Sequence, residues 1–393
     1  MGLRWITAGE SHGPALVGII SGLPAGLEIS TGEVQSELAR RQKGAGRSSR
    51  QKIESDRAEF VAGIRHGKTI GSPVAVIIRN VDHANWADTM AVEAEPSDPS
   101  AARAFPRPGH ADLAGMLKWG LDDARNVLER ASGRTTAVTV ALGALCRQYL
   151  RQFGTFLGCR LIRYGGECLI DFDKSSPTRS EIEDPSRILD FRRLSDGQNA
   201  RIENAVRVAR EKGDTLGGVL QVVAAHLPPG LGSCALPDER LDYRLGAAIL
   251  GVPGIKAMEI GEGISQASMG GREADDRFAV ADDPAHEPWF GRESNLAGGI
   301  EGGMSNGEPV CITAWMKPLS TVHPPLKSVD PLTRRAVDVG APERSDVSAL
   351  ESVACVIEAV VALELARAHL DKFSGDSLSD VKKAYESYTK TIQ

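Results

Sequence analysis

Two of the eight histidines stand in turns of small residues, where an imidazole is accessible to a ligand. His12 follows residues 9–11 (GES), and His110 follows residues 108–109 (PG). An imidazole donates or accepts a proton near neutral pH, so two of them beside one ligand could protonate a leaving oxyanion and stabilise a charged group. Either histidine alone is more simply explained as a turn residue whose ring hydrogen-bonds to the backbone.

Arginines in turns are the second feature with chemical meaning. They lie in or beside segments that contain Gly, Ser or Pro: Arg41, Arg47, Arg50, Arg107, Arg130, Arg134 and Arg344. The planar guanidinium fork binds phosphate and carboxylate through two parallel hydrogen bonds. A small ligand with two carboxylates and one phosphate would need about this many cations. For a single basic run such as residues 40–43, a solvated surface remains the simpler interpretation.

Other ligand classes find less support. RNA binding through the basic loop from Lys43 to Lys52 is a possible alternative, but no aromatic residues interleave to stack bases, and the net charge of the chain is -6. The glycine-rich residues 297–307 permit a close approach of the backbone to a flat or phosphorylated ligand, yet they match neither the ATP-binding nor the NAD-binding glycine pattern. We expect no metal site, because His and Cys are not clustered at zinc spacing.

The periodicity of apolar residues predicts the elements that position these side chains. Ser30 and Glu33 have the spacing of a helix N-terminus. Strands are expected at Leu3–Thr7, Ala15–Ser21, Leu220–Ala225 and Val310–Met316. Helices are expected from Ser30 to about Gln42, from Ser132 to Gly154 in the interior, and over Val347–Leu370. A charged amphipathic tail is expected from Asp376. Residues 91–109 are expected to form an irregular loop and residues 171–200 to be exposed. The mixed order of helices and strands favours an α+β layered arrangement.

One domain over residues 1–393 is expected, because no linker or repeat divides the chain. The six cysteines contain no C-x-x-C pair, and several lie among apolar residues, as buried free thiols do. The N-terminus has no secretory pattern, and no apolar run is long enough to span a membrane. We therefore expect a cytoplasmic protein without a membrane segment.

Six motifs that occur in order along the chain resemble the chorismate synthase family. They are GESHGP (9–14), RPGHAD (107–112), ERAS (129–132), GDTLGG (213–218), MKP (316–318) and ERSD (343–346). Together they extend from residue 9 to residue 346. The resemblance implies a β-α-β sandwich, a homotetramer and a phosphate-eliminating lyase of the shikimate pathway that uses reduced FMN.

The resemblance also implies roles for individual residues. His12 would protonate the departing phosphate, His110 would lie against the reduced flavin, and Asp346 would act as a base for the flavin N5 proton. The substrate, 5-enolpyruvylshikimate 3-phosphate, would be held by Ser11, Arg41, Arg47, Arg50, Arg107, Arg134 and Arg344. Contacts to FMN would come from Arg130, Ala131, Ser132, Pro253, Gly254, Gly302, Lys317, Pro318, Leu319, Ser320, Thr321 and Arg344.

A 1,4-elimination in anti geometry is not favoured as a concerted reaction, and the flavin would carry its difficult step while the protein orients the ligands and excludes water. No NADPH-dependent flavin reductase domain is recognisable, so an external reductant is expected. Some positions depart from the family pattern: Gly133, Thr135, Pro253, Leu296 and Glu351. These departures leave a second interpretation open, a flavin-binding paralogue impaired in catalysis.

Overall fold

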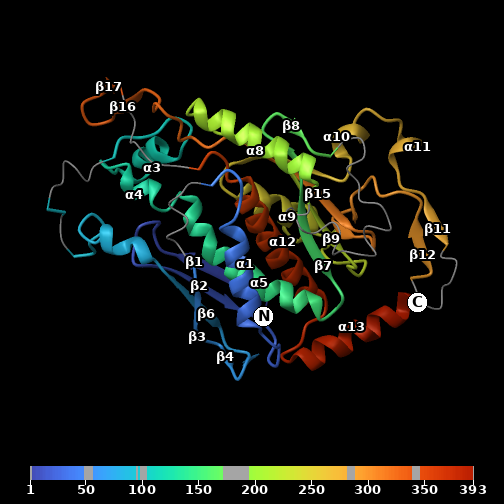
Figure 1. Ribbon diagram of the computed structural model, residues 1–393. Helices are drawn as coiled ribbons and strands as arrows, with labels where there is room; N and C mark the ends of the chain where they lie inside the picture. The colour runs from blue at the N-terminus through green and yellow to red at the C-terminus, as the bar shows by residue number, and fades with distance from the viewer. Residues whose placement is uncertain are drawn as a thin grey trace.

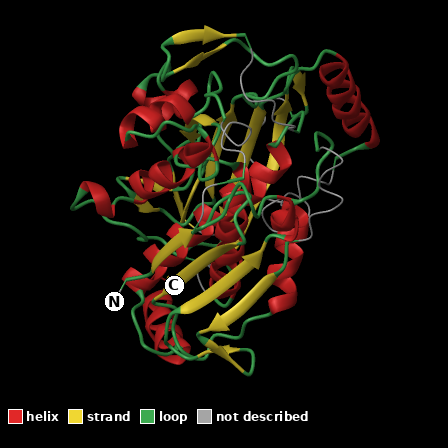
Figure 2. Ribbon diagram, turned by 90° about the vertical axis from the view of Figure 1, so that its left-hand side faces the viewer, coloured by secondary structure: helices red, strands yellow, loops and turns green. Residues whose placement is uncertain are grey.

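The computed structural model describes residues 2–47, 56–93, 96–97, 104–170, 194–280, 288–338 and 346–392. Two antiparallel sheets form outer layers, and helices α1, α5 and α12 lie between them (Figure 1). Figure 2 shows the two sheets as separate groups of strands. This architecture confirms the predicted α+β class and its β-α-β layering.

The first sheet contains the N-terminal strands in the order β1-β2-β6-β3. Its strands are β1 (Arg4–Ala8), β2 (Ala15–Ser21), β6 (Val74–Arg79) and β3 (Ala58–Ala62). Leu16 and Ile20 of β2 are buried, and the strand packs against α5. A Cβ atom at Gly18 would lie 2.5 Å from Val138 of α5, so glycine lets the helix approach the sheet closely.

The second sheet has the order β10-β15-β9-β7-β8. Its strands are β10 (Ile255–Ile260), β15 (Val310–Met316), β9 (Gly218–Ala225), β7 (Phe156–Tyr164) and β8 (Glu167–Cys168). Alternate residues of β9, among them Leu220 and Val222, belong to the apolar core, as the two-residue period of a strand requires. Helix α12 covers this face through β7 and β9.

The middle layer consists of α1 (Thr31–Arg41), α5 (Thr136–Arg151) and α12 (Leu350–Lys372), with α9 (Leu241–Leu250) packed on α12. Helix α12 is buried around almost its whole circumference, which is typical of a helix at the centre of a large core. A Cβ atom at Gly143 of α5 would lie 2.4 Å from that of Ala359 of α12. The two helices can therefore meet only because this position has no side chain.

Smaller elements surround the layers. The helices are α3 (Asp112–Trp119), α4 (Arg125–Leu128), α8 (Asp196–Glu211), α10 (Gly263–Gln266), α11 (Gly271–Ala274) and α13 (Leu378–Ile392). The short strands pair as β4 (Ile64–Arg65) with β5 (Lys68–Thr69), β11 (Phe278–Val280) with β12 (Phe290–Arg292), β13 (Ile300–Glu301) with β14 (Met304–Ser305), and β16 (Ser328–Asp330) with β17 (Arg335–Val337).

The expected strands and helices are all present, with small shifts of their ends. Strands β2 and β15 have the predicted bounds, and the Ser30 side chain accepts a hydrogen bond from the Glu33 backbone at the start of α1. The helix expected after Ser132 begins as a 3-10 turn over Gly133–Thr135. Of the segment expected to be exposed, residues 171–193 lie outside the described residues, and residues 196–200 begin α8. The one-domain organisation stays a prediction.

The cysteines agree with the expectation of free thiols. All six are unpaired, and Cys146, Cys159, Cys311 and Cys355 are buried. Within the described ranges no helix has the length and apolar character needed to cross a bilayer. The same ranges contain no group of three or more His, Cys, Asp or Glu residues that could hold a metal ion.

His369 of α12 makes the stability of the fold depend on pH. Its ring is fully buried among the aromatic side chains of Phe153, Phe373 and Tyr385, and its Nδ1 lies 2.7 Å from the Tyr149 hydroxyl. Burial lowers the pKa of His369 to about 3. An unfolded chain binds a proton at this residue below about pH 6.5, whereas the folded chain does not. Stability supplied by the neutral ring is therefore present above pH 6.5 and is lost as the pH falls toward 3.

We expect the free energy of unfolding to fall by about 1 kcal/mol per pH unit below pH 6.5 through this residue. His369→Gln removes the titrating ring, so the difference in unfolding free energy between wild type and variant should shrink by about 2 kcal/mol between pH 7 and pH 5. Urea denaturation at both pH values measures this difference. A difference that does not change with pH would contradict the prediction.

Candidate active site

Most of the predicted site residues line one cavity of about 580 Å³. The volume lies in the range of pockets that hold small ligands and cofactors. Among the residues predicted to act on or bind the substrate, the lining contains Ser11, His12, Arg41, Arg47, Arg107, His110, Arg134 and Asp346. Among those predicted to contact FMN, it contains Ala131, Ser132, Pro253, Gly254, Lys317, Pro318, Leu319, Ser320 and Thr321.

Four predicted residues are placed elsewhere or not described. Arg130 does not line the cavity and donates hydrogen bonds to the Thr7 and Gly9 carbonyl oxygens at 3.2 Å each. Gly302 lies in the turn between β13 and β14 and does not line the cavity. Arg50 and Arg344 lie outside the described residues. The roles of all the predicted site residues stay predictions.

His12 is held in the loop between β1 and β2 by a carboxylate and an indole. Its Nδ1 lies 2.8 Å from Oε1 of Glu129, and its backbone N–H donates to Oε2 of the same side chain at 2.8 Å. The ring of Trp86 packs against the imidazole with a centroid distance of 3.8 Å. Only 5% of His12 is exposed, so the ring is both buried and fixed in orientation.

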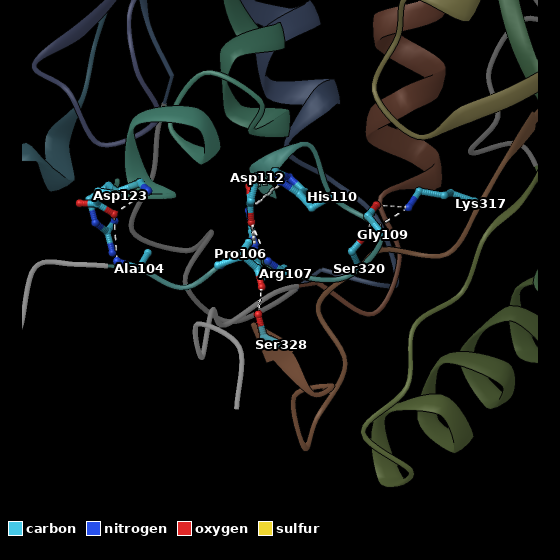
Figure 3. Close-up of polar contacts among 11 residues, drawn as sticks. Ala104, Pro106, Arg107, Gly109, His110, Asp112, Asp123, Lys317, Ser320 and Ser328 are labelled. Atoms are coloured by element: carbon cyan, nitrogen blue, oxygen red, sulfur yellow. Dashed lines mark hydrogen bonds and ion pairs between the residues drawn. The ribbon is translucent and has the colours of Figure 1, made fainter. Parts of the chain in front are cut away.

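His110 and Arg107 share the carboxylate of Asp112, the first residue of α3 (Figure 3). Asp112 is fully buried; its Oδ2 accepts from Arg107 Nε at 2.9 Å, and its Oδ1 contacts His110 Nδ1. Burial raises the pKa of Asp112, but the hydrogen bonds and charges of His110 and Arg107 outweigh it, and the net pKa is lowered. Asp112 therefore carries a negative charge that compensates the cation beside it.

The turn before α3 is attached to the segment after β15. Both Lys317 Nζ and Ser320 Oγ donate to the Gly109 carbonyl oxygen, at 2.6 Å and 2.8 Å. Figure 3 shows both side chains meeting at Gly109, with Lys317 on the side away from Asp112. His110 is therefore positioned by residues that are more than two hundred positions apart in the sequence.

Three further arginines, Arg41, Arg47 and Arg134, form a cationic part of the cavity wall. The Asp56 carboxylate pairs with Arg134 at 2.6 Å and with Arg41 at 3.6 Å. Burial lowers the pKa of Arg41 to about 10, and the nearby charges of Arg47 and Arg134 act in the same direction, whereas Asp56 opposes the shift. One carboxylate does not neutralise two guanidinium groups, so this wall attracts an anion.

Arg47 completes the cationic wall and contacts the predicted base. Its Nη1 donates to Asp346 Oδ2 at 2.7 Å, and its Nε is buried without a hydrogen-bond partner among the described residues. A buried donor without a partner is unfavourable, and an anionic ligand in the cavity could satisfy it. Arg47 belongs to the loop considered above for RNA binding, but its side chain faces the cavity.

The remainder of the lining is mostly apolar and includes Val252, Met316, Val353 and Val356. Apolar and cationic surfaces in one cavity fit a ligand pair with a flat ring system and several phosphate or carboxylate groups. The residues present thus fit reduced FMN together with a phosphorylated dicarboxylate.

Sequence patterns missed the carboxylates that orient the predicted residues. Glu129 and Asp112 lie inside the quoted motifs, one position before Arg130 and two positions after His110, and this proximity was the only local signal. Asp56 has no such signal, because its partner Arg134 lies 78 positions away. Trp86 was also missed, although it covers one face of His12.

The residues that depart from the family pattern have separate places. Pro253 lines the cavity, whereas Leu296 lies outside its lining and its backbone N–H donates to Asp276.

The Thr135 hydroxyl donates to the Ser132 carbonyl oxygen at 2.9 Å, and the Gly133 carbonyl oxygen accepts from Arg41 at 2.6 Å. Glu351 is buried under the loop that carries Arg47, where its Oε1 accepts from the Ala45 backbone at 2.9 Å. Burial raises the pKa of Glu351.

Comparisons with known proteins agree with the motifs. The sequence model described as "Chorismate synthase" matches residues 3–370. The chorismate synthase of Anaeromyxobacter sp. (strain K) is 46% identical, and the match covers 100% of this chain and 100% of that protein. The chorismate synthase of Aquifex aeolicus is 40% identical, and the match covers 100% of this chain and 98% of that protein. A solved structure titled "Crystal Structure of Chorismate Synthase" superimposes with a TM-score of 0.77 and 32% identity, covering 100% of this chain and 98% of that one. Nothing in these matches indicates an impaired paralogue, and the chain belongs to the chorismate synthase family.

Proposed function

We propose that this chain forms chorismate by eliminating phosphate from 5-enolpyruvylshikimate 3-phosphate in an anti-1,4 sense, with reduced FMN and without net redox change. One observation carries the proposal: in the described part of the chain, four guanidinium groups and two imidazoles line one cavity with an apolar wall. The guanidinium groups suit the phosphate and the carboxylates of the substrate. The apolar wall suits a flat ring.

In this reaction the C–O bond to phosphate breaks and its electron pair leaves with the phosphate, while the C–H bond breaks and its electron pair forms a new C=C bond as the existing double bond shifts. His12 donates a proton to the departing phosphate, as a buried and oriented imidazole can do. Arg41, Arg47 and Arg134 stabilise the charge that accumulates on the phosphate and hold the carboxylates. Asp346 would serve as the base for the flavin N5 proton, and its carboxylate lies 2.7 Å from Arg47 Nη1, which orients it.

The cofactor is proposed to contact the predicted flavin residues, with His110 beside its ring. When bound, reduced FMN supplies the transient electron density that assists the loss of phosphate. The Lys317 and Ser320 contacts with the Gly109 carbonyl oxygen hold the turn that carries His110 in the cavity wall. An external flavin reductant and a homotetramer complete the proposal.

Turnover tests the proposal directly. Anaerobic protein with reduced FMN and 5-enolpyruvylshikimate 3-phosphate should release phosphate and form chorismate in equal amounts, whereas oxidised FMN should support neither. Phosphate is measured by a coupled assay and chorismate by its absorbance. A folded protein that binds reduced FMN but releases no phosphate would reject the proposed activity. Chorismate formation with NADPH and oxidised FMN alone would show that no external reductant is needed.

A further inference from the structure

Glu129 is a buried carboxylate that no step above uses. It follows α4, it is 2% exposed, and both of its oxygens are directed to one residue. Oε2 accepts the backbone N–H of His12, and Oε1 lies 2.8 Å from His12 Nδ1. The backbone carbonyl of Glu129 also accepts from the Ser11 N–H at 2.9 Å. The residue thus contacts the main chain and the side chain of the loop that carries His12.

The charge on Glu129 determines which ring nitrogen of His12 carries a proton. Burial raises the pKa of Glu129, but the hydrogen bonds and charge of His12, together with the charge of Arg125, outweigh it, and the net pKa is lowered. An ionised carboxylate only accepts hydrogen bonds, so Nδ1 must be the donor. Nε2 is then the ring nitrogen left for proton exchange with a ligand.

Trp86 and Arg125 restrict the ring further. The indole packs on the imidazole at a centroid distance of 3.8 Å, and its Nε1 donates to Asp82 at 3.1 Å. The Arg125 guanidinium donates to Glu129 Oε1 at 3.2 Å and lies 5.1 Å from the Trp86 ring centroid. The hydrogen bond to the Glu129 carboxylate restricts rotation of the imidazole about its bond to Cβ. The Trp86 indole, packed on the face of the imidazole, restricts tilting of the ring.

We propose that Glu129 is the positioning residue of His12, holding its imidazole with Nδ1 protonated so that Nε2 faces the leaving group. This inference rests on the proposed function, in which His12 donates the proton. Glu129 itself does not touch the substrate. Its contribution is the orientation of the ring and the choice of tautomer, as in other sites where a carboxylate orients an imidazole.

Glu129→Gln is a sharp test because the amide has only one acceptor atom. The His12 backbone N–H is always a donor, so the glutamine oxygen must face it and the NH₂ group must face Nδ1. With the NH₂ group against Nδ1, the ring cannot carry protons on both nitrogens, so it remains neutral with its proton on Nε2 and is a much weaker acid than the imidazolium that donates the Nε2 proton in the wild type. We expect kcat to fall about 100-fold, with a change in KM of less than about 3-fold.

Ring-labelled ¹⁵N-histidine spectra report the tautomer without turnover. Wild type should show a protonated Nδ1 for His12, identified by its loss in His12→Ala, and Glu129→Gln should show a protonated Nε2 instead. In a His12→Ala background, Glu129→Gln should change kcat by less than about 2-fold, because both changes remove the same contribution. If Glu129 only stabilised the fold, the losses in kcat from His12→Ala and Glu129→Gln would add in the double variant.

Asp123→Asn is the matched control, since Asp123 accepts the Arg125 backbone N–H at 2.8 Å without contacting His12. It should keep both the wild-type kcat and the His12 spectrum.

If Glu129→Gln does not fold, Glu129→Asp retains the charge but shortens the side chain, and it should give a kcat between those of wild type and His12→Ala. A folded Glu129→Gln with wild-type kcat, an unchanged His12 tautomer or additive losses would overturn the inference. If wild type showed no turnover, the proposed function would fail while the tautomer measurement still decided the role of Glu129.

Discussion

His12→Ala should lower kcat by about 10²- to 10⁴-fold, the usual contribution of a positioned general acid. The imidazole lines the cavity, is 5% exposed and is held by both Glu129 and Trp86. Without it, phosphate must leave without a proton donor. The arginines of the cavity remain, so KM should change by less than about 3-fold. Steady-state chorismate formation with saturating reduced FMN measures both constants.

His66→Asn is the matched histidine control. His66 and Gly67 form the exposed turn between β4 and β5, with φ of 50° and 73°. Asparagine is well tolerated at this backbone conformation. This variant should keep the wild-type rate, and circular dichroism at the assay temperature should show that both variants are folded. A His12→Ala enzyme with the wild-type kcat would remove His12 from the mechanism.

Glu358→Ala should cost about 3–5 kcal/mol of unfolding free energy, the effect of removing one partner from a buried ion pair. Glu358 of α12 is fully buried and contacts Arg40 of α1 and Arg147 of α5, the latter at 2.7 Å. Its Oε1 also accepts the Cys159 backbone N–H of β7 at 2.7 Å. The variant would leave two guanidinium groups without this charge in the core. Urea denaturation at fixed protein concentration and pH 7 measures the loss.

The control is Glu211→Ala in α8. Glu211 pairs with Arg207 at 2.7 Å, but both side chains are about 60% exposed. An exposed pair of this kind contributes less than about 1 kcal/mol. Equal losses in Glu211→Ala and Glu358→Ala would contradict the assignment of a structural ion cluster between the three helices and the sheet.

Local sequence patterns were sufficient for the elements with a clear period. Ala15–Ser21 and Val310–Met316 have continuous apolar character between turns, and Ser30 satisfies a backbone N–H of the first turn of α1. The motifs around His12 and His110 contributed to the identification of the family, because they occur in order with four others along the chain. The polar helix α8 was missed, since its buried residues Ile202, Val206 and Ala209 are sparse among charged ones.

The amino-acid sequence by itself determined the layered class, the three helices of the middle layer, strands β1, β2, β9 and β15, and the family to which the chain belongs. These properties depend on periodicity and on short motifs, which are local. Only the tertiary structure decided that Glu129 orients His12 from 117 positions away and that α5 and α12 meet at Gly143 and Ala359. Such contacts depend on how the layers pack, because a carboxylate or a glycine has no intrinsic preference for a distant partner.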